Sequence, residues 1–406
     1  MKKWKIIMYK KYLLSILVLF LLLIATNMQF AYSADDEPPL SIWSLRALSM
    51  GGTGICCSND MDALIYNPAC LEALKGNDMA LNVPVLGVNS DIFNSLQDIY
   101  KAYTDSGETG LVSAALDFLL TPDELSIAPR ACPSLGLVTP MLPIKLGIGV
   151  YGGIDTSIGK EWDILVPKYT LNATVDGVGI VGVARKFEIG DTIFLPEGVK
   201  PNTLSLGMNL KYVAARFKIN STIGIDNLFS LLTETNPDYM SLFTYKRGSG
   251  IGFDGGLLFS FNNNTMSAGL SLTDIGGTAI NYDPDPATIP MGIHTGFAWR
   301  PSKLVTFEMD LRNIASGGDF LMKTHFGAEY NLGQLTKVTG LHQVLSSITL
   351  RGGFNSGYET CGLKVSLDLV IIRANIEAMY YQEEIGDYAS NISRDLWIIS
   401  VTAGLF

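Results

Sequence analysis

The sequence is poor in the side chains on which most enzymes and metal sites depend. Its 406 residues contain three histidines, and its five cysteines follow no zinc-binding spacing. It has no Gly-x-Ser-x-Gly nucleophile motif, and the Gly147-x-Gly149 spacing lacks the lysine and helix of a phosphate-binding loop. We therefore expect a protein that is not an enzyme, with no cofactor and no metal site.

Charged residues are also scarce, at 17% against roughly 25% in soluble domains. Because no stripe of basic residues is present, nucleic acid is not an expected partner. After residue 33 the chain has no apolar run of about 20 residues, the length of a membrane-spanning helix. It does have 48% hydrophobic residues and 41 glycines, a composition typical of β-strands that face an apolar environment.

Residues 1–33 are predicted to be a cleaved signal peptide. Lysines at positions 2, 3, 5, 10 and 11 precede an apolar run at 12–25, and Ala31, Ser33 and Ala34 follow it. A retained membrane anchor is the alternative, although roughly 13–14 apolar residues are few for a spanning helix. Cleavage would leave 24 basic and 39 acidic residues, a net charge of about −15.

From about residue 79 onward, apolar and polar residues alternate in segments of roughly nine to twelve residues, the pattern of strands with two different faces. In residues 304–312, Phe307 and Met309 lie on one face, and Glu308 and Asp310 lie on the other. We expect about fourteen such strands. They lie near 79–88, 133–141, 144–155, 168–186, 203–217, 248–261, 264–273, 291–300, 303–312, 322–331, 347–355, 359–367, 370–381 and 395–406.

Strands of about 9–11 residues cross a bilayer when they are tilted, and a closed barrel leaves no backbone edge unpaired in lipid. The sequence therefore predicts an all-β fold: a closed antiparallel transmembrane β-barrel of about 14 strands over residues 79–406, in the Gram-negative outer membrane. An even strand count places both ends on the periplasmic side. The competing interpretation is a soluble β protein whose apolar rows form a dry core between two sheets.

The predicted connections sort by length, as they do in bacterial barrels. Tight periplasmic turns are expected at Pro140–Pro143, Asn262–Asn264 and Pro301–Ser302, and long outer loops at 89–132, 156–167, 218–247, 274–290 and 382–394. Two connections, 187–202 and 332–346, are long where this arrangement expects short ones.

Two of the outer loops carry apolar residues at helical spacing, so we expect helical outer loops. These residues either form a small core over the barrel mouth or offer an apolar docking surface to a hydrophobic ligand. The candidate ligand groove consists of Phe93, Leu96, Tyr100, Tyr103, Leu228, Phe229 and Leu232.

Charged side chains on the polar strand faces are expected to line the lumen and to pair across it, because an unpaired buried charge is costly. They either form a structural network or set what passes through the barrel. The expected lumen-lining residues are Glu308, Asp310, Arg312, Glu329, Arg351, Arg373 and Glu377.

Residues 34–78 are predicted to form an N-terminal plug inside the lumen. The segment has glycines for close backbone approach, carboxylates that accept from amides, and an Asn-Pro pair that starts a short helix. The expected plug or gate residues are Gly51, Gly52, Gly54, Asp60, Asp62, Asn67 and Pro68. Cys56 or Cys57 forms a disulfide with Cys70, or all three are small buried residues.

Residues 45–74 resemble a stretch found in the FadL superfamily of outer membrane proteins, which has an Ala-x-x-Met-Gly-Gly-x-Gly opening, a short acidic run and Asn-Pro-Ala. Cys56, Cys57 and Cys70 stand where that family usually has small residues. Residues 250–257, 274–277, 328–333 and 351–353 are similar to the PorV/PorQ and TraF-like branch of the superfamily. The matching positions are Ala47, Met50, Gly51, Gly52, Gly54, Asp60, Asp62, Ala63, Asn67, Pro68, Ala69 and Leu71.

The resemblance implies passive passage or capture of hydrophobic small molecules, with movement of the plug opening a path through the wall or the lumen. The implied partners are outer membrane lipid and either a hydrophobic small molecule or a secreted protein. In the second case the chain would be a non-transport accessory of protein secretion or conjugation that binds protein at its outer loops. Fold alone does not decide between the two functions.

Overall fold

The structure is a computed structural model. The expected signal peptide, Cys57, Asp60, His342 and the terminal Phe406 lie outside the residues that it describes. The described residues are 37–56, 61–74, 78–88, 97–98, 100–102, 104–107, 110, 126–127, 130–141, 143–163, 166–189, 201–224, 244–262, 264–283, 285–317, 319–333, 345–369, 372–384 and 393–405.

Strands make up most of the described chain. Fourteen of them are long, as the alternation predicts. The long strands are β1 (Asp78–Val88), β4 (Ser134–Met141), β5 (Ile144–Asp163), β6 (Val166–Glu188), β7 (Pro201–Gly224), β8 (Tyr245–Phe261), β9 (Met266–Thr273), β12 (Gly292–Trp299), β13 (Val305–Leu311), β14 (Thr324–Asn331), β15 (Leu345–Asn355), β16 (Tyr358–Leu369), β17 (Ile372–Glu384) and β18 (Ser393–Leu405).

The remaining elements are short. The short strands are β2 (Ser126–Ile127), β3 (Arg130–Ala131), β10 (Thr278–Tyr282) and β11 (Ala287–Ile289). The helices include α2 (Leu45–Ser49), α3 (Ala63–Tyr66) and the 3₁₀ helices η1 (Pro68–Ala73) and η3 (Leu321–Lys323), and the described residues between 97 and 110 are helical as well. In the described part of the chain, no helix is both long and apolar enough to cross a membrane.

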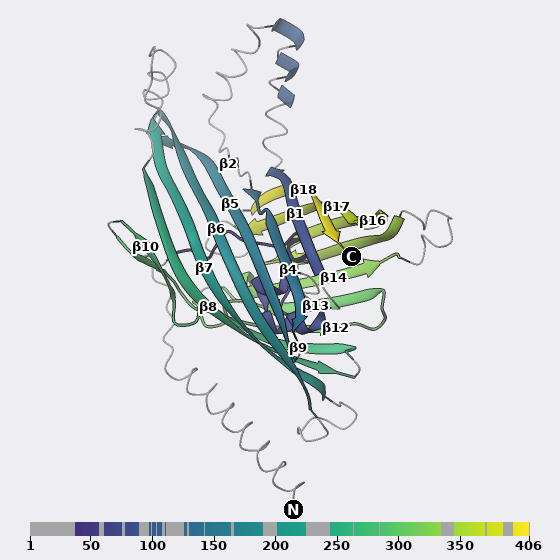
Figure 1. The fold of residues 1–406 in the computed structure, drawn as a ribbon. Helices are drawn as coiled ribbons and strands as arrows, with labels where there is room; N and C mark the ends of the chain where they lie inside the picture. Colours follow the sequence, from purple (N-terminus) through teal and green to yellow (C-terminus); the bar gives the residue numbers. More distant parts are fainter. Residues whose placement is uncertain are drawn as a thin grey trace, which may run out of the picture.

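The strands form a single closed sheet (Figure 1). Each long strand pairs antiparallel with the next one along the chain, and β1 closes the ring by pairing with both β4 and β18. The closing register begins at Met79 opposite Leu405. Because the ring is closed, the barrel wall presents no unpaired edge to lipid. The predicted closed antiparallel barrel is therefore confirmed.

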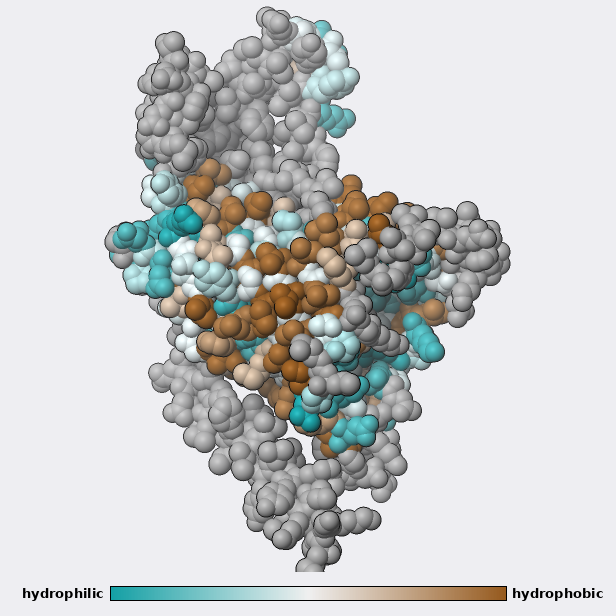
Figure 2. Space-filling view, viewed as in Figure 1, coloured by the Kyte–Doolittle hydropathy of each residue, from teal (hydrophilic) through white to brown (hydrophobic). Residues whose placement is uncertain are grey.

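The apolar rows of the strands face outward. On β13, Met309 is 46% exposed, whereas its neighbours Glu308 and Asp310 are 1% and 0% exposed. Figure 2 shows the outward residues gathered into a broad hydrophobic band over the strands that face the viewer. A dry core between two sheets would require the opposite, with apolar rows buried and charges outside. The wall therefore has the polarity of a membrane-spanning barrel.

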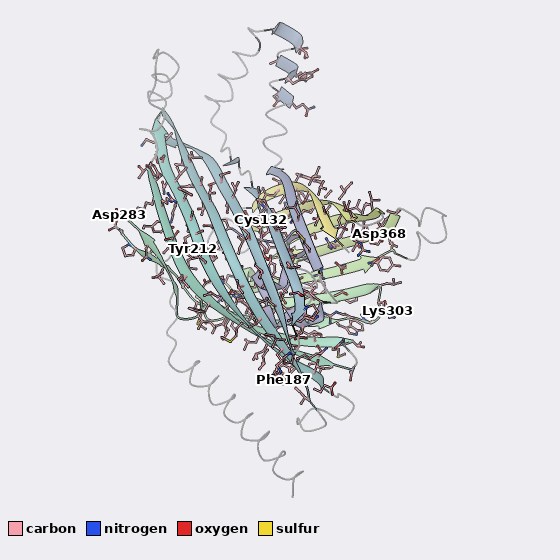
Figure 3. The ribbon with its side chains drawn as sticks, viewed as in Figure 1. Cys132, Phe187, Tyr212, Asp283, Lys303 and Asp368 are labelled. Carbon is pink, nitrogen blue, oxygen red and sulfur yellow. The ribbon has the colours of Figure 1, made fainter. Side chains whose placement is uncertain are left out.

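We call the end at which β1 begins and β18 ends the terminal edge, and the opposite end the distal edge. Phe187, Lys303 and Asp368 belong to the terminal edge and lie toward the lower and right parts of Figure 3, whereas Asp283 belongs to the distal edge at the left. Strands β5–β8 rise well beyond the other strands toward the distal edge (Figure 1).

The predicted outer loop at 156–167 is wrong. Strands β5 and β6 stay paired up to Asp163 opposite Val166, so this region is a long hairpin. The two strands continue because antiparallel backbone hydrogen bonds form in water as well as in the bilayer. The run from Asp155 to Glu161 is too polar to show an apolar row, so its alternation could not be recognised. Likewise, β7 extends to Gly224, and a hairpin of β10 and β11 occupies much of 274–290.

The chain ahead of β1 packs against inward-facing side chains of the barrel. We call residues 37–74 the N-terminal segment. Its buried Ile55, Leu64 and Leu71 share one hydrophobic cluster with wall residues that include Val138 and Ile180. The largest apolar core of the described chain thus lies inside the barrel, between this segment and strands β4–β6.

Candidate functional site

One side of the lumen is apolar. We call the inward-facing apolar residues and glycines of β4, β5 and β6 the apolar wall. Val138, Val178 and Ile180 are buried there, in the same cluster as Leu64 and Leu71 of the N-terminal segment. Between these side chains, the wall has inward glycines at positions 136, 147, 149 and 182.

The wall glycines leave the space that the N-terminal segment occupies. A Cβ atom at Gly147 would lie 3.0 Å from Leu71 Cδ2 and 3.1 Å from Leu64 Cδ2. At Gly182 it would lie 2.5 Å from Leu64 Cδ2. Interiors at this packing density do not accommodate even one added carbon without a shift. Leu64 of α3 and Leu71 of η1 therefore fill the space that the missing side chains of these glycines leave along the wall.

Hydrogen bonds fix this part of the segment. Tyr151 Oη donates to Met61 O at 2.9 Å, and Asn209 Nδ2 donates to Leu64 O at 2.7 Å. Asn67 Oδ1 accepts from Ala69 N at 3.1 Å and caps η1. Since backbone groups buried in the lumen need partners, these contacts replace water.

Asn67-Pro68 and Gly51-Gly52 lie where the N-terminal segment closely approaches other backbone. Asn67 Nδ2 donates to Ile55 O at 2.8 Å and to Leu257 O on β8 at 3.2 Å, and Pro68 begins η1. Gly51 has a φ of +68°, and a Cβ there would lie 2.4 Å from Phe326 O. Glycine is needed at this position for conformation and for space.

The other side of the lumen is polar, and it holds the preceding part of the segment. Gly54 N and Ile55 N donate to Asp310 Oδ2 at 2.7 and 3.1 Å, and Cys56 N donates to Glu308 Oε1 at 2.7 Å. Three successive backbone amides thus point at two carboxylates of β13. These three hydrogen bonds anchor the segment to the polar wall.

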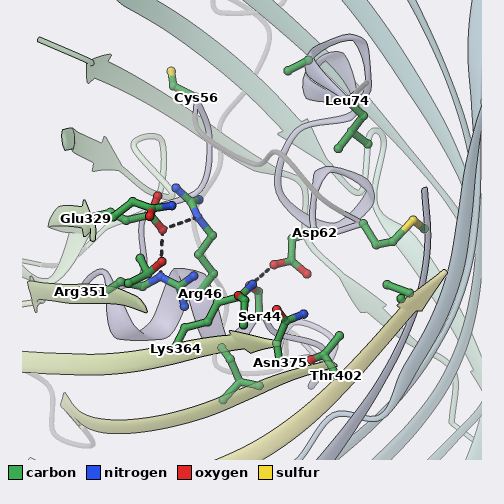
Figure 4. Close-up of a pocket in the computed structure, with 18 of the residues that line it drawn as sticks. Ser44, Arg46, Cys56, Asp62, Leu74, Glu329, Arg351, Lys364, Asn375 and Thr402 are labelled. Carbon is green, nitrogen blue, oxygen red and sulfur yellow. Dashed lines mark hydrogen bonds and ion pairs between the residues drawn. The ribbon is translucent and has the colours of Figure 1, made fainter. Parts of the chain in front are cut away.

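An ion-pair network continues along this polar wall over β14–β17 (Figure 4). Glu329 accepts from Arg46 at 3.1 Å and from Arg351 at 2.9 Å. Glu377 accepts from Arg351 at 2.7 Å and lies 3.3 Å from Lys364 Nζ. Because Arg46 belongs to α2, the network ties the N-terminal segment to the wall.

The other two predicted lumen residues, Arg312 and Arg373, lie apart from this network. The Arg312 guanidinium stacks 4.8 Å from the centre of the Tyr66 ring. Burial raises the pKa of the Tyr66 phenol to about 12, so the ring stays neutral. Arg373 lies 2.7 Å from Asp368 Oδ1 at the terminal edge, where both side chains are partly exposed.

Sequence reasoning missed a strap that holds the start of the segment. Glu37 Oε1 lies 3.1 Å from the Arg216 Nε of β7 and accepts from Tyr282 Oη at 2.9 Å. Ser41 N donates to Asp176 Oδ2 on β6 at 2.7 Å. A bulge between Val213 and Arg216 brings the arginine to the inner face.

A second buried charge cluster was also missed. Lys211 Nζ lies 2.8 Å from Asp254 Oδ1 and 2.7 Å from Asp274 Oδ1, and Thr278 Oγ1 donates to Asp274 at 2.6 Å. The cluster sits where the chain bends between β9 and β10. Asp274 has a left-handed backbone, with φ +52°, at this bend.

A cavity of about 1150 Å³ lies in the lumen between the N-terminal segment and the terminal edge (Figure 4). Figure 4 shows Ser44 bonded to Asp62 at its border. Serine, threonine, asparagine and charged side chains supply most of its lining. Among the lining residues are Arg46, Cys56, Asp62, Lys145, Lys186, Ser205, Arg300, Glu329, Arg351, Lys364, Arg373, Asn375, Glu377 and Thr402.

The predicted ligand groove is largely outside the described residues, which include only Tyr100. Tyr100 belongs to a helical stretch, and its side chain is exposed.

The predicted small cysteines are buried where the structure describes them. Cys70 Sγ donates to Ile55 O at 3.4 Å, and Cys56 and Cys70 are buried. A disulfide to Cys57 falls outside the described chain. Among described residues, no group of three or more His, Cys, Asp or Glu side chains could hold a metal ion.

Comparison with protein-family models finds no match, and comparison with curated proteins finds none. Solved structures that are similar include the toluene transporter TbuX of Ralstonia pickettii, at a TM-score of 0.47 and 12% identity over 90% of this chain and 98% of that chain. The toluene transporter TodX of Pseudomonas putida scores 0.44, with 10% identity over 90% and 98%. A FadL homologue of Pseudomonas aeruginosa scores 0.32, with 10% identity over 92% and 99%.

At these scores and identities, the likeness decides neither the ligand nor the activity of this chain. The PorV/PorQ and TraF-like branch favoured by the sequence resemblance stays a prediction.

Proposed function

We propose that the chain is an outer membrane channel that admits hydrophobic small molecules by passive passage, with the N-terminal segment as its plug. The observation that carries this proposal is the apolar wall, covered by Leu64 and Leu71. A water-filled bacterial pore has a polar interior. An apolar inner stripe that only a movable segment covers suits a hydrophobic solute better than an aqueous one.

The plug would open when a hydrophobic solute takes the place of its leucine side chains on the apolar wall. When α3 and η1 cover the apolar wall, the leucine side chains remove its surface from water. A hydrophobic solute of similar shape would bury the same surface, so its entry offsets the loss of the leucine contacts. The described chain shows no nucleotide-binding loop, and this exchange requires no coupled energy source.

The orientation follows from the same proposal. The signal peptide at 1–33 would export the chain, and the terminal edge, at which β1 begins and β18 ends, would face the periplasm. The distal edge, with the tall hairpins of β5–β8, would face outward. Hydrophobic molecules would then enter at the distal edge and leave through the cavity at the terminal edge.

The test is uptake into proteoliposomes that contain the full-length protein. We expect a small apolar fluorophore to enter faster than in protein-free vesicles, and Ile180→Asn on the apolar wall to slow its entry several-fold. Thr349→Asn, on the polar wall, is the matched control and should change little. Equal uptake with and without protein, or equal effects of the two substitutions, would contradict the proposal.

No contact among the described residues favours an accessory role in secretion or conjugation, so we propose no second function.

A further inference from the structure

The cavity at the terminal edge has a charge opposite to that of the chain. Among the described residues, its lining has seven basic side chains and four acidic ones, whereas the whole chain carries a net charge of −10. One more carboxylate, Asp368, pairs with the lining residue Arg373 and lowers the excess to two positive charges. A cavity of one sign inside a low-dielectric wall concentrates ions of the other sign.

Much of the excess lies on one side. Along the polar wall, Glu329 and Glu377 pair with Arg46, Arg351 and Lys364 and leave one positive charge. The side formed by β5–β12 contributes three lining cations beside one lining carboxylate, Glu72 of η1. We call Lys145, Lys186 and Arg300 the cationic arc.

The cationic arc contacts oxygen atoms of the wall and of the N-terminal segment. Arg300 donates to Ser267 Oγ at 2.9 Å and to Cys56 O at 2.8 Å, and Lys145 Nζ lies 3.4 Å from Glu72 O. The Glu72 carboxylate is also close enough to interact with Lys145. Within the described chain, Lys186 forms no ion pair. Hydroxyl side chains stand between these cations at positions 203, 205, 260 and 267.

We call the cavity at the terminal edge the vestibule. We propose that the vestibule is anion-selective: it admits small inorganic and organic anions in preference to cations of the same size. Cationic side chains lining a pore are the usual means of anion selection. Unlike the apolar passage proposed above, the vestibule requires no movement of the N-terminal segment. The two proposals can therefore fail separately.

Two adjacent residues of β6 give a matched pair of variants. Lys186 and Arg185 occupy successive positions, so their side chains point to opposite faces of the wall. Arg185 lies outside, 5.1 Å from the centre of the Phe187 ring, whereas Lys186 lines the cavity. Lys186→Glu and Arg185→Glu change the net charge equally, but only Lys186→Glu changes the charge inside.

The test introduces a thiol by Thr203→Cys in the full-length protein, since Thr203 lines the cavity. Modification by an anionic and a cationic methanethiosulfonate is followed by mass spectrometry of the peptide that contains the new thiol. Each rate is divided by the rate of the same reagent with 2-mercaptoethanol. We expect the anionic reagent to react about tenfold faster, a ratio that approaches one at 1 M salt, where the Debye length is about 3 Å.

Lys186→Glu should lower this ratio about fivefold, and Arg185→Glu should leave it within about twofold. A ratio at or below one in the parent, or equal effects of the two reversals, would overturn the proposal. So would a thiol that neither reagent reaches, because the vestibule would then be closed to water. Retention of the heat-modifiable band on gel electrophoresis shows that each variant is folded.

Discussion

Replacing Glu308 by Gln and Asp310 by Asn together is expected to loosen the N-terminal segment without unfolding the barrel. The two carboxylates receive the amides of residues 54–56 at 2.7–3.1 Å. Their second oxygens, Glu308 Oε2 and Asp310 Oδ1, have no hydrogen-bond partner. An amide side chain can therefore keep its oxygen on the backbone N–H groups and turn its NH₂ to the side without a partner.

The magnitude depends on how much charge the two carboxyl groups carry. Glu308 and Asp310 are buried two positions apart on the inner face of β13, so we count one negative charge for the pair. Hydrogen bonds to charged acceptors are about twice as strong as neutral ones, so the loss of this charge weakens the contacts by about 1–2 kcal/mol in all. That loss corresponds to an increase of roughly five- to thirtyfold in the open population.

Single-channel recording in planar bilayers measures this population as the frequency and duration of openings. The control, Asp285→Asn with Glu359→Gln, makes the same chemical changes at exposed positions. We expect the control to behave as the parent. If Glu308→Gln with Asp310→Asn opened no more often than the control, and Glu308→Ala with Asp310→Ala did not either, these contacts would not hold the segment in place.

Three further outcomes are expected. Deleting residues 45–70 should raise the leak through the barrel in planar bilayers, and unchanged conductance would count against a plug. Gly353→Ala should lower the unfolding temperature by several degrees in a thermal melt, because its Cβ would lie 2.6 Å from Gly51 N. At pH 8, N-ethylmaleimide should label the exposed Cys361 and spare Cys132, since burial raises the pKa of the Cys132 thiol to about 12; equal labelling in a peptide map would refute this.

The barrel could be predicted because its signal repeats. Every strand that contributes an outward row shows the period of two, as Met309 does between Glu308 and Asp310. The ends of the strands could not be predicted in the same way. Beyond the bilayer both faces of a hairpin meet water, so β5 and β6 continue to Asp163 and Val166 without an apolar row to mark them.

The candidate site was predicted in part, and the limit is physical. The glycines and the Asn-Pro pair of the N-terminal segment are local signals, because backbone geometry requires those residue types. The strap at Arg216 has no local signal. Strict alternation from Lys211 would place Arg216 outside, and the bulge that reverses its direction depends on pairing with β6 and β8. Contacts set by register are invisible until the sheet is assembled.

The two walls of the lumen hold the N-terminal segment by different forces, which decides how it would move. Against the apolar wall, Leu64 and Leu71 contribute burial worth about 1.5–3 kcal/mol each, which any apolar molecule of suitable size can replace. Only the hydrogen bonds from Tyr151 and Asn209 to the backbone would be lost there without replacement. Against the polar wall, the amides of residues 54–56 and the guanidinium of Arg46 bind through a larger number of directional contacts, which an apolar solute cannot replace. A hydrophobic solute would therefore displace α3 and η1 more readily than residues 44–56. The plug would then open by partial release along β4–β6, and leave the polar wall covered.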